Sequence, residues 1–222
     1  MTKATVRART ISGVLRLALA GGVMAAGCSS GPVPVDDTTA YVTHVEQQRA
    51  RKDVFFRSAD KDNPVPKDKQ DQIVPLSYYP IDPDYRIPAA LTPGAEQPVL
   101  EMPTSTGKMR KVTQVGVLGF TVKGDPMRLT AFAGEGPGGA PDMSRLFVPF
   151  SDATSGKETY AAGRFLDLDR TATAVYVIDF NEAYNPYCAY NATFDCPLPP
   201  PSNRLKVPVH AGEKVKPESR GE

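Results

Sequence analysis

The chain has 222 residues, and its 26 Lys and Arg residues nearly balance 25 Asp and Glu residues, which leaves a formal net charge of +1. This balance excludes a strong nucleic-acid binder, which would show a clear basic excess. Hydrophobic residues make up 41% of the chain and charged residues 23%, so it is not intrinsically disordered, and its 22 prolines and 18 glycines favour turns and short strands over long helices.

Residues 1–27 have the pattern of an export signal. They contain four basic residues, the last of them Arg16, and no acidic residue. The eleven residues 17–27 carry no charge, but eleven are too few to cross a bilayer as a helix, which needs about 20 apolar residues. A basic segment followed by a short apolar run is typical of a secretory signal peptide.

The apolar run ends in Ala25-Ala26-Gly27-Cys28. This order resembles the lipobox of bacterial lipoproteins, in which the cysteine is lipidated and becomes the new N-terminus, although Ala25 stands where that pattern usually has Leu. We therefore expect a palmitate-type lipid on Cys28 that anchors the protein to the cell membrane on its extracytoplasmic face. The alternative is an ordinary signal peptide that is cut elsewhere and leaves Cys28 as a free thiol.

The next segments predict a tether and one helix. Residues 28–37 are rich in Ser, Gly and Pro and show no apolar period, which indicates a flexible tether. Apolar and aromatic residues from Tyr41 to Phe56 then recur at helical spacing, which predicts a helix over 39–57. His44 lies in it and is interpreted as a surface or capping residue. We assign a single β-rich domain to residues 38–217 and a polar tail to residues 218–222.

The middle of the chain predicts β structure. A charged loop covers residues 60–71, and the prolines of residues 73–88 exclude a helix and a central strand there, leaving short edge strands or a wrapping segment. Gly116 and Gly119 suggest a bulge or a bend. The predicted fold is mainly β, an antiparallel sheet, sandwich or partly closed barrel, with one N-terminal helix. Its main strands are predicted at residues 108–122, 127–133, 146–150, 163–168 and 174–180.

Known cofactor and metal motifs are weak or absent in the sequence. Residues 134–139 match G-x-G-x-x-G, but a dinucleotide site needs a helix directly after the glycines, and the next residues, Ala140-Pro141-Asp142, lead to another strand. This segment is therefore interpreted as a hairpin loop. With only two histidines, His44 and His210, a histidine-rich metal site or a Ser-His relay is poorly supported. We predict no cofactor and no metal.

Cys188 and Cys196 are the other two cysteines of the chain. In an exported protein such a pair is first interpreted as a disulfide, and the seven intervening residues can close the loop. We expect this bond to fix the proline-rich run at residues 196–201, whose prolines cannot donate to a sheet. A reduced pair, buried or reactive, is the alternative.

The C-terminal third contains clusters of uncommon residues in a fixed order. They are Thr154-Ser155-Gly156, Thr159-Tyr160 and the ranges 163–166, 179–190, 196–201 and 211–213. Together with residues 79–83 and the end of the predicted helix, this series resembles the bacterial family called domain of unknown function 1684, over roughly residues 45–215. The resemblance implies no activity, since the function of that family is unassigned.

These clusters also contain the candidate site residues. The side chains of Asp179, Asn181 and Asn185 either shape turns through bonds to their own backbone or belong to a polar pocket. Arg164 is either a bidentate clamp for a carboxylate or phosphate or half of a buried salt bridge with Asp179. Glu213 is either an acid–base group or a surface carboxylate. The candidate ligand-binding residues are Tyr160, Arg164, Asp179, Asn181, Asn185 and Glu213.

Two classes of function follow. The first is a non-catalytic lipoprotein that binds a small ligand or a cell-envelope partner. The second is an extracytoplasmic, hydrolase-like enzyme that uses Arg164, Asp179 and Glu213 in a polar pocket, but the sequence offers no nucleophile–base pair, so no catalytic residue is assigned. If these side chains converge in one concave pocket, a ligand or catalytic site is favoured over a purely structural role.

Overall fold

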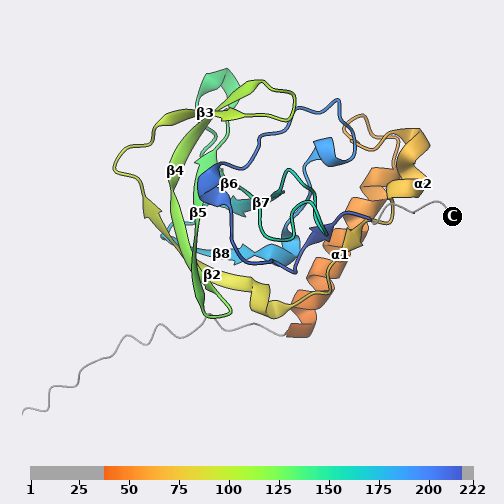
Figure 1. The fold of residues 1–222 in the computed structure, drawn as a ribbon, viewed down its shortest axis with the longest axis horizontal. Helices are drawn as coiled ribbons and strands as arrows, with labels where there is room; N and C mark the ends of the chain where they lie inside the picture. The colour runs from red at the N-terminus through yellow and green to blue at the C-terminus, as the bar shows by residue number, and fades with distance from the viewer. Residues whose placement is uncertain (1–37, 217–222) are drawn as a thin grey trace, which may run out of the picture. The chain divides into compact units, whose positions relative to one another are not determined.

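A computed structural model describes residues 38–216 of the chain (Figure 1). Strands make up 37% of the described residues and helices 23%, which confirms the prediction of a mainly β fold. The elements are α1 (Thr38–Arg57), α2 (Gln70–Ile73), β1 (Ser77–Tyr78), β2 (Arg86–Pro93), β3 (Val99–Pro103), β4 (Met109–Val122), β5 (Asp125–Ala133), β6 (Arg145–Phe150), β7 (Arg164–Asp169), β8 (Val175–Asp179) and β9 (Glu213–Lys214).

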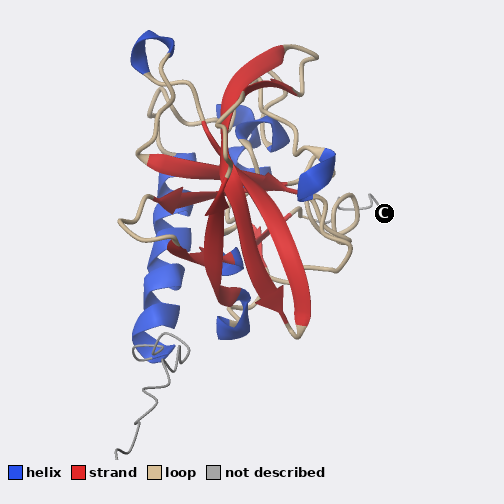
Figure 2. Cartoon of the chain, turned by 90° about the vertical axis from the view of Figure 1, so that its left-hand side faces the viewer, coloured by secondary structure: helices blue, strands red, loops and turns tan. Residues whose placement is uncertain are grey.

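Seven strands form one antiparallel sheet that curls into a nearly closed barrel (Figure 2). The strand order is β7-β6-β5-β4-β2-β8, and β3 pairs with the first part of β4. The chain that follows β8 returns to β7, where Tyr184 and Phe165 exchange two backbone hydrogen bonds of 2.9 and 3.0 Å. This segment therefore bridges the two end strands of the sheet. β1 and β9 form a separate two-stranded sheet.

The prediction of edge strands over residues 73–88 is wrong for β2, which lies between β4 and β8. The position of its prolines explains why a central strand tolerates them. Pro88 lies opposite Val177 of β8, in the half of β2 where the pairing with β4 has not begun, because that pairing starts at Ala90. Pro93 is the last residue of the strand. Each proline therefore faces a neighbour on one side only, as an edge proline does.

The bulge expected in the long central strand is present in β4. The register between β4 and β5 shifts between Gln114 and Gly116. A Cβ at Gly116 would approach the carbonyl oxygen of Thr92 to 2.5 Å, so the close contact between β4 and β2 requires glycine there. β4 can thus bend from its partner β3 toward its partner β2.

One apolar cluster fills the barrel, and a second packs α1 against the rest of the domain. The main core fills the barrel with fully buried side chains such as Leu118, Leu129 and Ile178. α1 begins one residue before the predicted helix, and its buried residues include Val45 and Phe56, which lie on one face. Phe56 packs in a second cluster with Val65, Val74 and Tyr190. α1 therefore docks on irregular segments that come before and after the barrel strands, and this placement creates the site described next.

The predicted export features lie outside the described residues. These are the signal peptide at 1–27, the lipid on Cys28, the tether at 28–37 and the tail at 218–222. Between residues 38 and 216, no helix combines the length and hydropathy that crossing a membrane requires.

Candidate functional site

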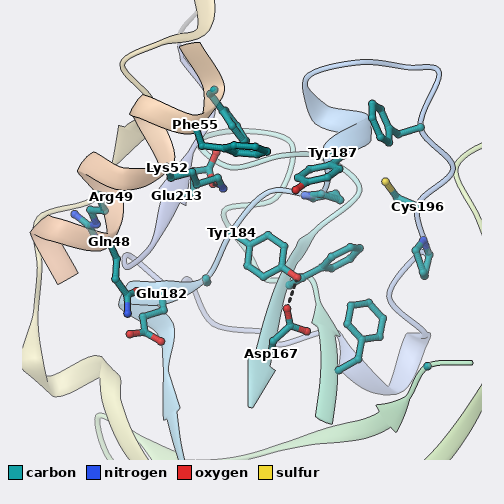
Figure 3. Close-up of a pocket in the computed structure, with 18 of the residues that line it drawn as sticks. Gln48, Arg49, Lys52, Phe55, Asp167, Glu182, Tyr184, Tyr187, Cys196 and Glu213 are labelled. Carbon is teal, nitrogen blue, oxygen red and sulfur yellow. Dashed lines mark hydrogen bonds and ion pairs between the residues drawn. The ribbon is translucent and has the colours of Figure 1, made fainter. Parts of the chain in front are cut away.

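A pocket of about 740 Å³ lies between α1 and the barrel end formed by β6 and β7 (Figure 3). α1 supplies one wall through Val45, Gln48, Lys52 and Phe55, whose spacing of three or four residues places them on one face of the helix. The opposite wall comes from β6, β7 and the segment 181–197. The volume is in the range of small-molecule sites, about 300–1,000 Å³.

Aromatic rings from separate elements form much of the pocket wall. Phe147 of β6 packs edge to face on Phe165 of β7, with ring centroids 4.8 Å apart, and Phe165 packs in the same way on Tyr184 at 5.9 Å. On the other side of the pocket, Tyr187 packs on Phe194 at 5.3 Å. Tyr187 remains 38% exposed. Ring surfaces that face a cavity offer a ligand apolar contacts and stacking.

A partly buried ion pair lies at one end of the pocket. Lys52 Nζ lies 2.7 Å from Glu213 Oε2, and the Glu213 side chain is fully buried. Asn185 donates its backbone N–H and its side-chain amide to the same carboxylate, each at 3.2 Å, and the Tyr190 hydroxyl donates to it as well. Burial, followed by the nearby Glu213 charge, raises the pKa of Tyr190 well above its usual value, so its hydroxyl stays a donor.

Gly212 explains how the chain brings Glu213 to this position. Its φ of +79° lies in the left-handed region, and a Cβ there would approach the carbonyl oxygens of Phe180 and Ala183 to 2.5 and 2.7 Å. Only glycine fits this close backbone crossing. The next residue then pairs with Tyr78 in β1 and turns its carboxylate toward Lys52.

A second carboxylate, Asp167, lies at the lower side of the pocket (Figure 3). Its Oδ2 accepts a hydrogen bond of 2.7 Å from the Tyr184 hydroxyl. Burial is the main cause that raises the pKa of Tyr184, and the Asp167 charge adds to it. Asp167 itself is exposed, and no ion pair within residues 38–216 includes it.

Arg164 does not reach the pocket, because it is fully buried in what we call the Arg164 clamp, formed by Arg164, Asp152 and the backbone of residues 209–213. Its Nη2 pairs with Asp152 Oδ2 at 2.8 Å and donates to the Val209 carbonyl at 3.0 Å. Its Nη1 donates to the carbonyl oxygens of Ala211 and Glu213. Of the two alternatives that the sequence left open for Arg164, a ligand clamp or a buried salt bridge with Asp179, the structure shows a buried salt bridge, but its partner is Asp152. The clamp holds the C-terminal segment against the barrel.

Asp179 belongs to another closed group, the Asp179 cluster of Tyr41, Asp179 and Asn181. The Tyr41 hydroxyl lies 2.8 and 3.0 Å from the two Asp179 carboxylate oxygens. The Asn181 backbone N–H donates to Asp179 at 2.9 Å, the Asx turn expected from the sequence. The Asn181 amide bonds the backbone of Asp82 through 2.8 and 3.0 Å contacts. Burial raises the pKa of Asp179 and opposes these hydrogen bonds, which lower it.

Tyr160 and the two cysteines form a third group beside the pocket. The Tyr160 hydroxyl lies 3.7 Å from Cys188 Sγ, and the Cys188 backbone N–H lies 3.2 Å from Cys196 Sγ. Burial raises the pKa of Cys196 to about 12, and burial raises the pKa of Tyr160 to about 12. Both cysteines are free thiols, so the predicted disulfide is not formed in the structure.

The reason for expecting the disulfide was that prolines cannot anchor the run at residues 196–201. The structure shows that its other residues do so. Leu198 donates its N–H to the Pro103 carbonyl at 2.8 Å, and the Cys196 carbonyl accepts from Ser105 N at 2.8 Å. The run is thereby held against the turn between β3 and β4. The thiols pack as small apolar groups around Phe165.

Of the six predicted ligand-binding residues, Asn181 and Glu213 line the pocket, and Tyr160, Arg164, Asp179 and Asn185 do not. The side chains of Tyr160, Arg164, Asp179 and Asn185 mainly make hydrogen bonds within the protein that hold its fold together. The sequence reasoning missed Lys52 and Asp167. Helical spacing could have placed Lys52 on one face with Phe55 and Phe56, but no sequence pattern connects these residues with a strand over a hundred positions later. Within residues 38–216, no three His, Cys, Asp or Glu side chains gather so as to hold a metal ion.

The curled sheet, the docked helix α1 and the pocket between them define a small, nearly closed β-barrel domain. The model of the family described as "Protein of unknown function (DUF1684)" matches residues 72–214, so the chain belongs to that family.

A solved structure supports the fold. The chain is similar to the uncharacterized protein from gene locus rrnAC0354 of Haloarcula marismortui, whose structure was determined in solution by NMR. The two share 36% sequence identity over 82% of this chain and 98% of that one, with a TM-score of 0.64. Among curated proteins, no match was found.

Proposed function

We propose that this protein is a membrane-anchored lipoprotein on the extracytoplasmic face of the cell membrane, and that its β domain binds a small ligand in the aromatic pocket. The observation that supports binding most strongly is the set of partly exposed rings around an open pocket of about 740 Å³. Rings that pack edge to face on one another and still border a cavity keep apolar surface that a ligand can bury.

Binding without catalysis is favoured by where the charged candidates lie. The enzyme hypothesis requires Arg164, Asp179 and Glu213 to act together on a substrate. Arg164 is fully buried and bonded to Asp152 and backbone carbonyls, and Asp179 is bonded to Tyr41. Glu213 borders the pocket, but its carboxylate is paired with Lys52. Each charge already has a partner in the scaffold, which is typical of a structural role.

The anchoring part of the proposal rests on the residue order before and at Cys28. The Cys28→Ala variant should leave the membrane fraction or stay unprocessed, because acyl chains provide the attachment. Cell fractionation and intact mass measurement of the wild type and the variant test this. A variant that partitions with membranes as the wild type does, with no lipid mass difference, would contradict it.

The binding part is tested by native mass spectrometry on protein extracted from its own envelope. We expect a non-covalent adduct of small mass that is lost on denaturation. Ligand-free protein in repeated envelope extracts would count against a resident ligand.

A further inference from the structure

Two carboxylates that line the pocket, Glu182 and Asp167, form no ion pair within residues 38–216. Glu182 lies beside Gln48 of α1, whereas Tyr184 lies beside Asp167 (Figure 3).

Asp167 shares the exposed side of β7 with Asp169, two residues further on, but the two carboxylates differ in their surroundings. Asp169 pairs with Arg145 at 3.1 Å, whereas Asp167 accepts from the neutral Tyr184 hydroxyl at 2.7 Å. Asp167 lines the pocket and Asp169 does not. The Arg145 pKa is raised by its bond to Asp169, and the Asp167 charge adds to this, but Arg145 and Asp167 form no ion pair. A carboxylate without an ion pair at a cavity wall favours a positively charged ligand group.

The surroundings of Asp167 suit an organic cation. Phe147 lies directly opposite Asp167 in the pairing of β6 and β7, and Tyr184 and Phe165 stand beside it. Aromatic faces attract ammonium groups through the ring quadrupole, and they also bury an apolar body. A carboxylate among rings thus combines the two attractions that an amine with an apolar body uses.

The same pocket already holds one ammonium in this way. Lys52 Nζ lies 5.2 Å from the ring centroid of Phe56, 5.4 Å from that of Tyr184 and 5.7 Å from that of Tyr190. Its counter-ion is Glu213, at 2.7 Å. Asp167 with its neighbouring rings repeats this arrangement without an ammonium of its own, and the Tyr184 ring belongs to both.

Of the cations that line the pocket, Lys52 and Arg110 are paired with carboxylates, whereas Arg49 is bonded to backbone carbonyls and keeps a buried Nε without a partner in the described part of the chain. Lys52 is paired with Glu213, and Arg110 donates to the Asp195 carbonyl at 2.8 Å and lies 3.7 Å from its carboxylate. Arg49 donates to two backbone carbonyl oxygens, at 3.0 and 3.2 Å. An anion would have to displace the carboxylates from Lys52 and Arg110, whereas a cation can meet Asp167 directly.

From this geometry we infer that the pocket binds an organic cation, an ammonium group attached to an apolar or aromatic body, with Asp167 as its counter-ion. This inference rests on the proposed function and adds the chemical class of the ligand.

The test compares three probes of similar size on the full-length chain in nonionic detergent, by isothermal titration calorimetry. The probes are benzyltrimethylammonium, benzyl alcohol and phenylacetate. We expect benzyltrimethylammonium to bind most tightly. Asp167→Asn should weaken its binding about tenfold, the scale of one well-placed charge or cation–ring contact, and leave benzyl alcohol unchanged. Asp169→Asn removes the same charge from the same strand and should leave all three affinities unchanged.

Two results would overturn the inference: phenylacetate binding more tightly than benzyltrimethylammonium, or an Asp167→Asn variant that binds the cation as the wild type does. In either case, saturable binding of benzyl alcohol would leave the pocket as a ligand site of another class. If none of the probes binds, the cation inference fails, and the proposed function is then decided separately by the adduct measurement on envelope-derived protein.

Discussion

The Arg164 clamp and the aromatic pocket each contain an aspartate, but the two carboxylates have different surroundings. In the clamp, both terminal nitrogens of a fully buried guanidinium are bonded to Asp152 and to backbone carbonyls of residues 209–213, and its Nε alone has no partner within residues 38–216. In the pocket, rings and the Asp167 carboxylate are left open to a cavity. Buried polar groups that are bonded within the chain stabilise one conformation, whereas groups that border a cavity and keep unused bonding capacity are available to a ligand. Charged residues in rare sequence clusters therefore belong here to the scaffold, and the site is formed largely by others.

The largest expected effect comes from breaking the clamp. Arg164→Met should lower the free energy of unfolding by about 3–5 kcal/mol, because it leaves the Asp152 carboxylate buried without its cation. Urea denaturation measures this loss. The matched control is Arg145→Met, which removes an exposed ion pair with Asp169 and should cost below about 1 kcal/mol. Equal losses for the two variants would show that the clamp is not a closed structural unit.

A smaller effect is expected from removing a tyrosine hydroxyl in the Asp179 cluster and, for comparison, one in the pocket. Tyr41→Phe and Tyr184→Phe each remove a hydroxyl that donates to an aspartate, at 2.8 and 2.7 Å. Tyr41→Phe should cost about 1–3 kcal/mol, because Asp179 is buried and keeps an unsatisfied oxygen. Tyr184→Phe should cost less than about 1 kcal/mol, because water can replace the hydroxyl at the exposed Asp167.

Denaturation of both variants under identical conditions gives the two values directly. A Tyr184→Phe loss as large as that of Tyr41→Phe would mean that Asp167 is as enclosed as Asp179, and the distinction between the closed cluster and the open pocket would fail.

The smallest expected effect is a pH dependence of the Asp179 cluster. Burial raises the pKa of Asp179 in the folded chain above its unfolded value, so the folded state binds this proton more tightly. The stability that the group contributes is then fully present below the unfolded pKa and is lost as pH rises through the folded pKa. The unfolding free energy of the wild type minus that of Asp179→Asn should therefore fall as pH rises from 3 to 7. A rise of this quantity over the same range would show that the hydrogen bonds, which lower the Asp179 pKa, outweigh burial, which raises it.

Local pattern was sufficient to predict the fold class. Alternation and turn residues located β4 to β8 to within about two residues at each end, because side chains on a half-buried strand repeat with period two. Helical spacing located α1 in the same way. The central position of β2 was missed, because tolerance of Pro88 depends on where two partner strands begin, and sequence alone does not contain that register.

The candidate site was predictable only in part, for a related reason. Residues 179–213 attracted attention because they are dense in polar side chains, and Glu213 and Asn181 do border the pocket. Arg164 was a candidate for holding a ligand, but the sequence alone does not tell whether an arginine side chain is buried or exposed. Lys52 and Asp167 come from a helix and a strand that meet only in three dimensions, so neither could be assigned before the fold was known.

The central claim is that the aromatic pocket holds a ligand, and neighbouring residues of α1 allow its most direct test. Phe55 lines the pocket, whereas Val54, beside it on the helix, is 71% exposed and does not. Native mass spectra of envelope-derived wild type, Phe55→Ala and Val54→Ala should show the same small-molecule adduct in the wild type and in Val54→Ala, and a reduced or absent adduct in a folded Phe55→Ala, checked by circular dichroism. An adduct of equal intensity in all three proteins would place the ligand elsewhere and contradict the account.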